Sequence, residues 1–387
     1  MTITSVSNFL ASGMSSGIKP SGAPDLALIT HVDGKPVTAA GVFTSNKMTA
    51  APVQICKEFL SETGGQAAAV IINSGNANAA TGEQGKKDAR TMASLTAEQI
   101  GCRTQEVLVC STGWIGYPLP IEKIKSSIPD IIESLSPDGG LEAAKAIMTT
   151  DTVPKTIEIK KDNFTIGGIA KGAAMLEPNM ATMLAVITTD AEIDSSSATE
   201  MLQDAVSTSF NCLTVDGAES TNDTVLLLAS GESGPTDKRV LAEALKEACK
   251  SLAIQMADDA EGSTKTVFLT VTGAATDTDA LKGARDTANC QLVKCSWYGE
   301  DPYWGRIAAE MGAADITFDP ETITISYGDQ VVYANGEAQT VDQQVLKEHM
   351  SGRKIKLDVD LGQGSGTAQI VTTDLSHAYI DENMRTS

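Results

Sequence analysis

Short apolar runs that end in glycine turns most constrain how this chain can fold. The segments "AAAVIINSG" (67–75) and "EVLVCSTG" (106–113) have the length and the closing glycine that are typical of buried strands. From Val240 to Asp258, in contrast, apolar residues recur at spacings of four and three, which predicts an amphipathic helix. Strand-like and helix-like segments alternate in this way along the chain. The sequence therefore predicts a mixed α/β protein.

The second half of the chain adds signals of antiparallel pairing. The segment "TVFLTVTGA" (266–274) alternates apolar and polar residues at a period of two, which predicts a strand. The segment 322–336, "TITISYGDQVVYANG", predicts a hairpin around Gly328 and Asp329. The segment 355–374, "IKLDVDLGQGSGTAQIVTTD", predicts a second hairpin with a glycine-rich turn. So much antiparallel pairing favours a layered α/β sandwich over a doubly wound parallel sheet.

Charge and composition exclude several classes of function. The 387 residues carry a formal net charge of -21, and such a surface repels nucleic acid and anionic membranes. The seven cysteines are scattered and the three histidines lie far apart, so we expect neither a disulfide framework nor a metal site. The first residues lack a signal-peptide pattern, and no apolar run is long enough for a bilayer. We therefore expect a cytoplasmic protein that does not enter a membrane.

Two glycine motifs do not predict a site in their context. The segment "GQGSG" (362–366) lies between two predicted strands, whereas a dinucleotide-binding loop requires a helix after it. The segment "GMSSG" (13–17) matches a nucleophile elbow around Ser15, but no convincing strand precedes it. We interpret it as a flexible entry segment.

The segment "LEPNMATMLAVITTDA" (176–191) places Thr182 directly between a Pro-Asn turn and an apolar run. A threonine that simply begins a core strand is the simplest interpretation. The alternative is an autoprocessed nucleophile, in which the Thr182 hydroxyl attacks the carbonyl of Ala181 and hydrolysis then frees a new α-amino group. That amine, with a pKa near 8, could act as the base for the adjacent hydroxyl. The small Ala181 and the turn at Pro178 and Asn179 suit this chemistry.

Many segments in order resemble the ornithine acetyltransferase family, also called glutamate N-acetyltransferase or ArgJ. The similar segments are "GIKPSGAPDLALI", "GVFTSNKMTAAPV", "NSGNANAATG", "VLVCSTGWIG", "AIMTTDTVPK", "KGAAMLEPNMATMLAVITTDA", "DGAESTNDTVLLLASG", "DAEGSTKTVFLTVTGAAT", "GEDPYWGRI" and "TTDLSHAYIDEN". They run through the whole chain. The chain departs from the family's usual residues at Ala174 and Glu177, before the expected cleavage point, and at Tyr303.

The resemblance implies an autoprocessed N-terminal-nucleophile enzyme with a layered α/β sandwich of the ArgJ/DmpA-like type. Cleavage between Ala181 and Thr182 would give an α chain of residues 1–181, which contains the oxyanion hole, and a β chain of residues 182–387. Thr182 would be the nucleophile, and Thr112 and Gly113 would form the oxyanion hole. The substrate-binding residues would be Thr149, Lys171, Thr182, Glu261, Asn383 and Ser387. Without the family resemblance, the simplest interpretation of Lys171 and Glu261 is that they are solvated surface charges. The simplest interpretation of the tail after Asp381 is that it is a frayed terminus.

The function implied is a ping-pong transfer of the acetyl group of N2-acetylornithine to glutamate in arginine biosynthesis. No cofactor and no metal would be required, and the assembly would be a heterotetramer of two α and two β chains. Acetyl-CoA as a further donor, which would make the enzyme bifunctional, stays open. Two rivals also stay open: a related N-terminal-nucleophile aminopeptidase or amidohydrolase, and an unprocessed acidic binding protein.

Overall fold

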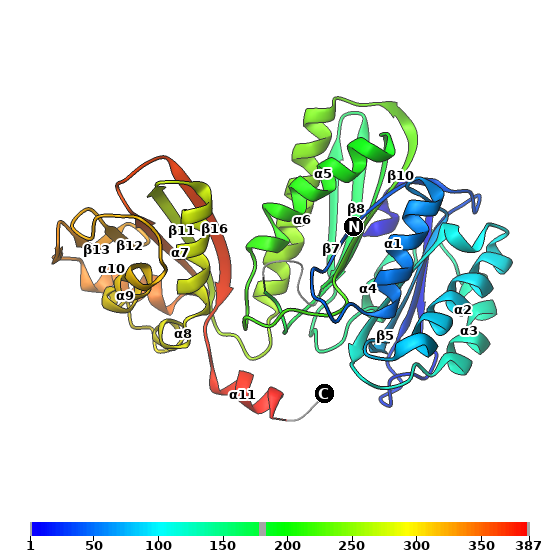
Figure 1. Ribbon diagram of the computed structural model, residues 1–387, viewed down its shortest axis with the longest axis horizontal. Coiled ribbons are helices and arrows are strands. Elements are labelled where there is room, and N and C mark those ends of the chain that lie inside the picture. Colours follow the sequence, from blue (N-terminus) through cyan, green and yellow to red (C-terminus); the bar gives the residue numbers. More distant parts are fainter. Residues whose placement is uncertain (1, 178–182, 385–387) are drawn as a thin grey trace. The chain divides into compact units, whose positions relative to one another are not determined.

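The computed structural model describes residues 2–177 and 183–384 (Figure 1). The chain divides into two compact units, each of which is continuous in space but not in sequence. Unit 1 comprises Met1–Asn211 and Ala218–Met256, and unit 2 comprises Cys212–Gly217 and Ala257–Ser387. Ala181, Thr182, Pro178, Asn179 and Ser387 lie outside the described residues. Among the helices of the described ranges, none combines the length and the apolar character that crossing a membrane would require.

Unit 1 contains a four-stranded sheet, sheet A, with the strand order β1-β2-β5-β6. Its strands are β1 (Phe9–Met14), β2 (Leu26–His31), β5 (Ala69–Asn76) and β6 (Val107–Trp114). The two strands predicted from their glycine endings are confirmed as β5 and β6, and they pair in parallel. Helix α2 (Gly82–Ile100) provides the crossover that a parallel pair needs. The carboxyl ends of β5 and β6 consequently lie together at one edge of sheet A.

Unit 1 also contains a six-stranded sheet, sheet B, with the order β4-β3-β10-β9-β8-β7. Its strands are β3 (Val37–Phe43), β4 (Gln66–Ala67), β7 (Lys155–Lys161), β8 (Phe164–Lys171), β9 (Leu184–Glu192) and β10 (Thr224–Pro235). The central strands β9 and β10 are parallel, and their outer neighbours β8 and β3 pair with them antiparallel. The edge of sheet B where β9 and β10 begin is therefore the edge where β3 and β8 end.

The two sheets of unit 1 share one apolar core. Alternate residues of the central strands, Leu184 and Val186 of β9 and Leu226 and Leu228 of β10, lie in the same buried cluster as the apolar residues of β5 and β6. Helix α1 (Ala51–Thr63) packs against β3 and β6, and α4 (Gly140–Ala146) packs against β1, β2 and β8. These two helices thus connect sheet A to sheet B.

Further helices of unit 1 also pack on its sheets. Helix α3 (Ile121–Glu133) packs on β1 and β2, and α5 (Ser195–Ser207) packs on β3 and β10. Helix α6 (Lys238–Asp258) confirms the amphipathic helix predicted from Val240. Its Gln255 side chain bonds to the backbone of Thr156 on β7. Short 3₁₀ helices cover Ile3–Ser5, Thr104–Glu106 and Phe210–Cys212.

Unit 2 is built on a second six-stranded sheet, with the order β14-β13-β12-β15-β11-β16. Its strands are β11 (Thr266–Ala274), β12 (Thr324–Tyr327), β13 (Gln330–Ala334), β14 (Glu337–Ala338), β15 (Lys354–Asp360) and β16 (Gly366–Thr373). Its helices are α7 (Asp277–Asn289), α8 (Gln291–Tyr298), α9 (Trp304–Ala313), α10 (Gln343–Ser351) and α11 (His377–Asn383). The core of this unit is centred on the fully buried Trp297, whose indole N–H donates to the Tyr327 hydroxyl at 3.3 Å.

Two sequence predictions about local structure are corrected and one is confirmed. The hairpin around Gly328 is confirmed, because β12 and β13 pair antiparallel across it. The hairpin predicted for residues 355–374 is wrong, since β11 lies between β15 and β16 and pairs with both. A glycine-rich connection looks the same in sequence whether its two strands are neighbours or flank a third. Strand β1 does precede "GMSSG", but no helix follows Ser15, so the nucleophile elbow is still absent there.

Candidate active site

The predicted oxyanion residues lie where β5 and β6 end side by side. In this register Ser74 pairs with Thr112 and Gly75 pairs with Gly113. Gly113 has a φ of 128°, and a Cβ added there would lie 2.4 Å from the carbonyl carbon of Gly75. Only glycine fits a position with both that dihedral angle and that approach of two backbones. The segment "STG" is therefore not an ordinary turn but the constrained carboxyl end of β6, which we call the turn at Gly113 because the register shifts there.

A network of polar side chains fixes this turn. The Ser111 hydroxyl donates to Oδ1 of Asn73 at 2.6 Å, and Nδ2 of Asn73 donates to the carbonyl of Asn76 at 2.8 Å. Asn76 pairs with both Thr112 and Trp114, which is the irregular register of a β-bulge. Thr112 is buried in this arrangement. These bonds restrain the backbone on both sides of the β5–β6 pair at the position of Thr112.

Lys171 is buried, which corrects the simplest expectation of a solvated surface charge. It is the last residue of β8, it pairs with Leu184 of β9, and only 2% of its surface is exposed. A second lysine lies close to it. Burial lowers the pKa of Lys19, and the nearby Lys171 ammonium lowers it further, while Asp25 and Asp151 act in the opposite direction. Buried positive charge therefore collects at this end of β8.

Asp151 organises the loop that carries the predicted substrate contact Thr149. Its carboxylate accepts the backbone N–H of Thr149 at 2.9 Å and that of Gly172 at 2.7 Å, and the Lys155 ammonium donates to it at 2.6 Å. Burial raises the pKa of Asp151, but the ammonium groups of Lys171 and Lys155 lower it by more, to about 2. Asp151 is thus ionised at neutral pH and ties Thr149 to the end of β8. The motif "MTTDT" contained this residue, but its sequence gave no reason to prefer the acid over the threonines.

The predicted nucleophile Thr182 lies outside the described residues, and its first described neighbour is Met183. The Met183 N–H donates to Oδ1 of Asp223 at 2.8 Å, and the Met183 carbonyl accepts from the Thr224 N–H at 3.2 Å. Asp223 is completely buried. Burial raises the pKa of its carboxyl well above the usual range, against smaller opposing effects of the Met183 N–H and the Lys171 ammonium. Of the two positions near Thr182 where the chain departs from the family, Glu177 is buried and Ala174 is half-buried.

Two further predicted residues, Glu261 and Asn383, meet within unit 2. Glu261 is 8% exposed, so it too is no solvated surface charge, and Nδ2 of Asn383 donates to its Oε2 at 2.7 Å. Asn383 ends helix α11, whose first turn is capped by the Ser376 hydroxyl. The Tyr379 hydroxyl in this helix donates to the Asp216 carboxylate at 3.2 Å. The expectation of a frayed tail is therefore wrong as far as α11, and Ser387 lies outside the described residues.

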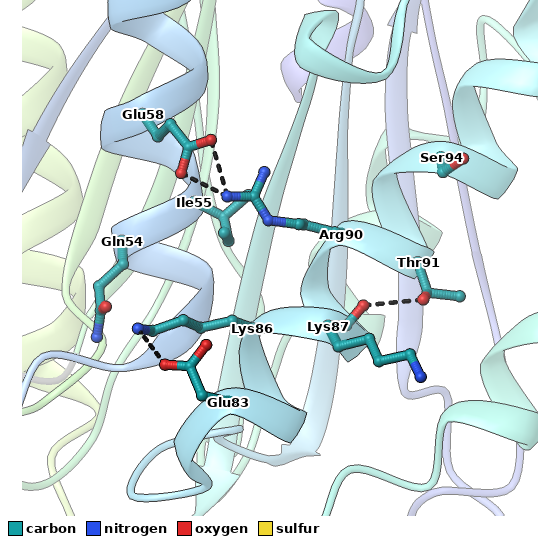
Figure 2. A pocket seen from close by; sticks show the side chains of 9 residues that line it. All are labelled: Gln54, Ile55, Glu58, Glu83, Lys86, Lys87, Arg90, Thr91 and Ser94. Atoms are coloured by element: carbon teal, nitrogen blue, oxygen red, sulfur yellow. Dashed lines mark hydrogen bonds and ion pairs between the residues drawn. The ribbon is translucent and has the colours of Figure 1, made fainter.

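A hollow on the surface of unit 1 lies away from these residues. It measures about 590 Å³, and Figure 2 shows its lining on α1 and α2. Two of its cations pair with carboxylates, Arg90 with Glu58 at 2.6 Å and Lys86 with Glu83 at 2.7 Å. It contains none of the predicted site residues. Within the described ranges, no three His, Cys, Asp or Glu side chains are grouped so that they could hold a metal ion.

Comparison with known proteins identifies relatives along nearly the whole chain. The sequence pattern of the ArgJ family matches residues 10–386. The chain is 46% identical to the arginine biosynthesis bifunctional protein ArgJ of Mycolicibacterium paratuberculosis, over 98% of this chain and 95% of that protein. It is 43% identical to the ArgJ protein of Streptomyces avermitilis, over 99% of each.

Solved structures are also similar to this chain. The arginine biosynthesis bifunctional protein ArgJ of Bacillus halodurans is 33% identical with a TM-score of 0.50, and the match covers 54% of this chain and 99% of that one. An ornithine acetyltransferase of Mycobacterium tuberculosis in complex with ornithine is 42% identical with a TM-score of 0.43. That match covers 45% of this chain and 93% of that one.

A first prediction tests whether the turn at Gly113 needs glycine. Gly113→Ala should lower the free energy of unfolding by about 2–5 kcal/mol, because the left-handed backbone and the clash with Gly75 both oppose a side chain. Gly116→Ala is the matched control, since Gly116 also has a positive φ but nothing lies within 4 Å of an added Cβ. That control should cost only about 1–2 kcal/mol. Equal losses in urea unfolding would mean that the approach of Gly75 does not constrain the turn.

A second prediction concerns the buried ion pair of Asp151. Asp151→Ala should lower the free energy of unfolding by about 3–5 kcal/mol at neutral pH, because it leaves the buried Lys155 without this carboxylate. The folded pKa of Asp151, about 2, lies below the ordinary value of 3.8 for an aspartate, so its contribution is complete above the higher value and is lost as the pH falls through the lower one. The difference from wild type should therefore stay constant from pH 7 to about pH 5 and shrink towards pH 2. Asp33→Asn, at an exposed ion pair, is the control and should change little. A difference that does not depend on pH would contradict this assignment.

Proposed function

The chain belongs to the ArgJ family, and on that premise we propose that it transfers the acetyl group of N2-acetylornithine to glutamate in arginine biosynthesis. The observation that best supports this proposal is that two structural elements needed for acyl transfer are hydrogen-bonded to one short segment of unit 1. The end of β6 that contains Thr112 and Gly113 is bonded to Asn222, and Met183, which follows Thr182, is bonded to Asp223. These two residues directly precede β10. A nucleophile and oxyanion donors in fixed register are the minimum for this chemistry.

The proposed reaction has two steps through an acetyl-enzyme. The Thr182 hydroxyl attacks the acetyl carbonyl of N2-acetylornithine while the α-amine of Thr182 accepts its proton. The amide C–N bond then breaks, ornithine leaves with that proton, and the acetyl group remains as an ester on Thr182. The amine of glutamate attacks this ester, which gives N-acetylglutamate and restores the hydroxyl. Thr112 and Gly113 would stabilise the oxyanion of both tetrahedral intermediates, where each donor contributes about 10²–10³ in kcat.

The charges of the described residues support an amino-acid substrate. Lys171 is a buried cation at the end of β8, with Lys19 close by, and it is suited to a substrate carboxylate. Thr149 is held by Asp151 in the adjoining loop. Glu261 is a buried anion, and we assign it to the side-chain ammonium of ornithine. The Bacillus and Mycobacterium relatives named above carry names that agree with this substrate class.

We further propose that cleavage between Ala181 and Thr182 makes the α and β chains, and that both stay in one sheet. The expected β chain supplies β9 and β10, and the expected α chain supplies β3 and β8 on either side of them. Cutting the connection between β8 and β9 leaves every strand pair of sheet B in place. The match to the Bacillus relative covers nearly all of a chain that corresponds to 54% of this one, which is the size a β chain of residues 182–387 would have. A dimer of this αβ pair, in the cytoplasm, completes the proposal.

The bifunctional alternative concerns the donor and not the acceptor. The names of the curated relatives describe them as bifunctional, and acetyl-CoA as a second donor would fit that word. We therefore include acetyl-CoA among the proposed substrates. An assay with glutamate as acceptor, and with either N2-acetylornithine or acetyl-CoA as donor, separates the two cases.

A third prediction tests the nucleophile. Wild-type protein should give two chains on a denaturing gel, and incubation with N2-acetylornithine alone should add one acetyl group at Thr182. Thr182→Ala lacks the hydroxyl that both steps need, so it should remain one chain of full length and take up no acetyl group. Thr182→Ser keeps a hydroxyl and should restore both properties at reduced rate. This mechanism would be contradicted if Thr182→Ala were cleaved, or if peptide mass spectrometry located the acetyl group on another residue.

A fourth prediction concerns the contact between the tail and Glu261. Asn383→Ala removes the hydrogen bond that orients the Glu261 carboxylate, which we assign to the ornithine ammonium, so KM for N2-acetylornithine should rise. Cleavage at Ala181 should be unaffected, because it needs no substrate. Met384→Ala is the control, since Met384 is 69% exposed, and its KM should not change. Removal of residues 383–387 should raise KM for glutamate as well. Unchanged KM values in all these variants would show that the tail serves only the fold.

A further inference from the structure

Two consecutive buried residues, Asn222 and Asp223, contact the two halves of the proposed site. They precede β10 directly, and they are 5% and 0% exposed. Neither was singled out by the sequence, where "STNDT" reads as an ordinary polar turn before a strand. Polar side chains are rarely buried without specific partners, so the partners of these two indicate what they do.

Asn222 binds the ends of β5 and β6. Its Nδ2 donates to the carbonyl of Ser111 at 2.9 Å and to the carbonyl of Ala77 at 2.6 Å. The Ser111 carbonyl belongs to the peptide group whose N–H is that of Thr112. Because a peptide group is planar and trans, fixing its carbonyl also fixes the direction of its N–H. Asn222 therefore fixes the peptide group that leads into the proposed oxyanion residues Thr112 and Gly113.

The orientation of the Asn222 side chain is itself determined. The Thr221 hydroxyl donates to Oδ1 of Asn222 at 2.6 Å, so the amide oxygen faces a donor and the amide nitrogen faces two acceptors. A flipped amide would turn its oxygen towards the carbonyls of Ser111 and Ala77. The backbone around it is anchored as well, since the Ala50 N–H donates to the Thr221 carbonyl at 2.9 Å.

Asp223 binds the strand that follows the proposed nucleophile. Its Oδ1 accepts the Met183 N–H at 2.8 Å, and its carbonyl accepts the Thr44 N–H at 3.0 Å from the end of β3. The next residue, Thr224, donates its N–H to the Met183 carbonyl at 3.2 Å. Both backbone polar groups of Met183 are therefore held from β10. Met183 is joined covalently to Thr182, so these bonds hold the chain immediately after the proposed nucleophile.

We propose that Asn222 and Asp223 are positioning residues that hold the oxyanion-hole turn and the nucleophile's strand in fixed register. The inference rests on the proposed function for the roles of Thr112 and Thr182. Adjacent residues on an extended chain point to opposite sides, which lets one dipeptide reach two elements at once. Register between the halves then depends on this dipeptide as well as on the shared apolar core of the two sheets. Such control matters because a displacement of about 1 Å at a reacting centre costs about 10²-fold in rate.

The test compares variants that remove each contact with variants that keep it. In Asn222→Ala and Asp223→Ala, kcat should fall about 10- to 100-fold while KM for N2-acetylornithine changes less than about threefold. In Asp223→Asn, kcat should stay within about threefold of wild type, because the amide keeps an Oδ1 acceptor for the Met183 N–H and resembles the neutral acid that burial favours. If Asn222→Ala fails to fold, Asn222→Asp replaces it, since it keeps the shape and loses the donor, and the same fall is expected.

The control is Thr188→Val, which removes a buried hydrogen bond of β9 to the carbonyl of Ile3, away from the start of the strand. It should lower the melting temperature and leave kcat unchanged. The proposal is overturned if the alanine variants lose stability like this control but keep kcat, or if Asp223→Asn is as slow as Asp223→Ala.

Autocleavage provides a readout that does not depend on acetyl transfer. Newly made Asn222→Ala chain should be cleaved more slowly at Ala181 than wild type, whereas Thr188→Val should be cleaved at the normal rate. If wild-type protein is cleaved but transfers no acetyl group to glutamate, the proposed function fails and slowed cleavage still supports the positioning role. If transfer is found in wild type and the variants are cleaved and turn over normally, the positioning role alone fails.

Discussion

The parallel pairing of β9 with β10 is the constraint on which the proposed site depends. Parallel strands begin at the same edge of a sheet, and their antiparallel neighbours β3 and β8 end at that edge. One edge of sheet B therefore collects Thr44, Lys171, Met183 and Asp223, which are far apart in sequence. Any change that shifted the register of β9 by one residue would turn its apolar side chains to the wrong face and separate these groups.

Buried charge at this edge is compensated locally and not by the acidic surface. The chain carries a net charge of -21, yet Lys155 and Lys171 are almost fully buried in unit 1. Moving an ammonium group out of water is costly unless a carboxylate accompanies it, and Asp151 fulfils that requirement for Lys155. Asp223 avoids the cost of a buried charge in another way, because its raised pKa favours the neutral form of the carboxyl group. The net charge thus argues against nucleic acid and anionic membranes as partners of the surface. It does not describe the charges that are buried at the site.

Local signals in the sequence predicted local structure well. Strands β5 and β6, helix α6 and the hairpin of β12 and β13 were predicted because each depends on periodicity or on a turn that a short segment determines. The placement of β11 between β15 and β16 was missed, since pairing of distant segments leaves no mark in either one. The burial of Lys171 was missed for the same reason, because a lysine in a strand reads as exposed until its neighbours are known. Thr112 and Gly113 were found through the family resemblance, and only the structure shows why position 113 excludes a side chain.

The bonds made by Asp151, Asn222 and Asp223 would position the proposed new N-terminus for catalysis. A new N-terminus is normally the most mobile part of a chain, because few bonds restrain it. Catalysis by such a terminus needs the opposite, a group held within a fraction of an ångström by its supporting residues. Here the N–H and the carbonyl of Met183 are both bonded to β10, so restraint begins one residue after the proposed terminus.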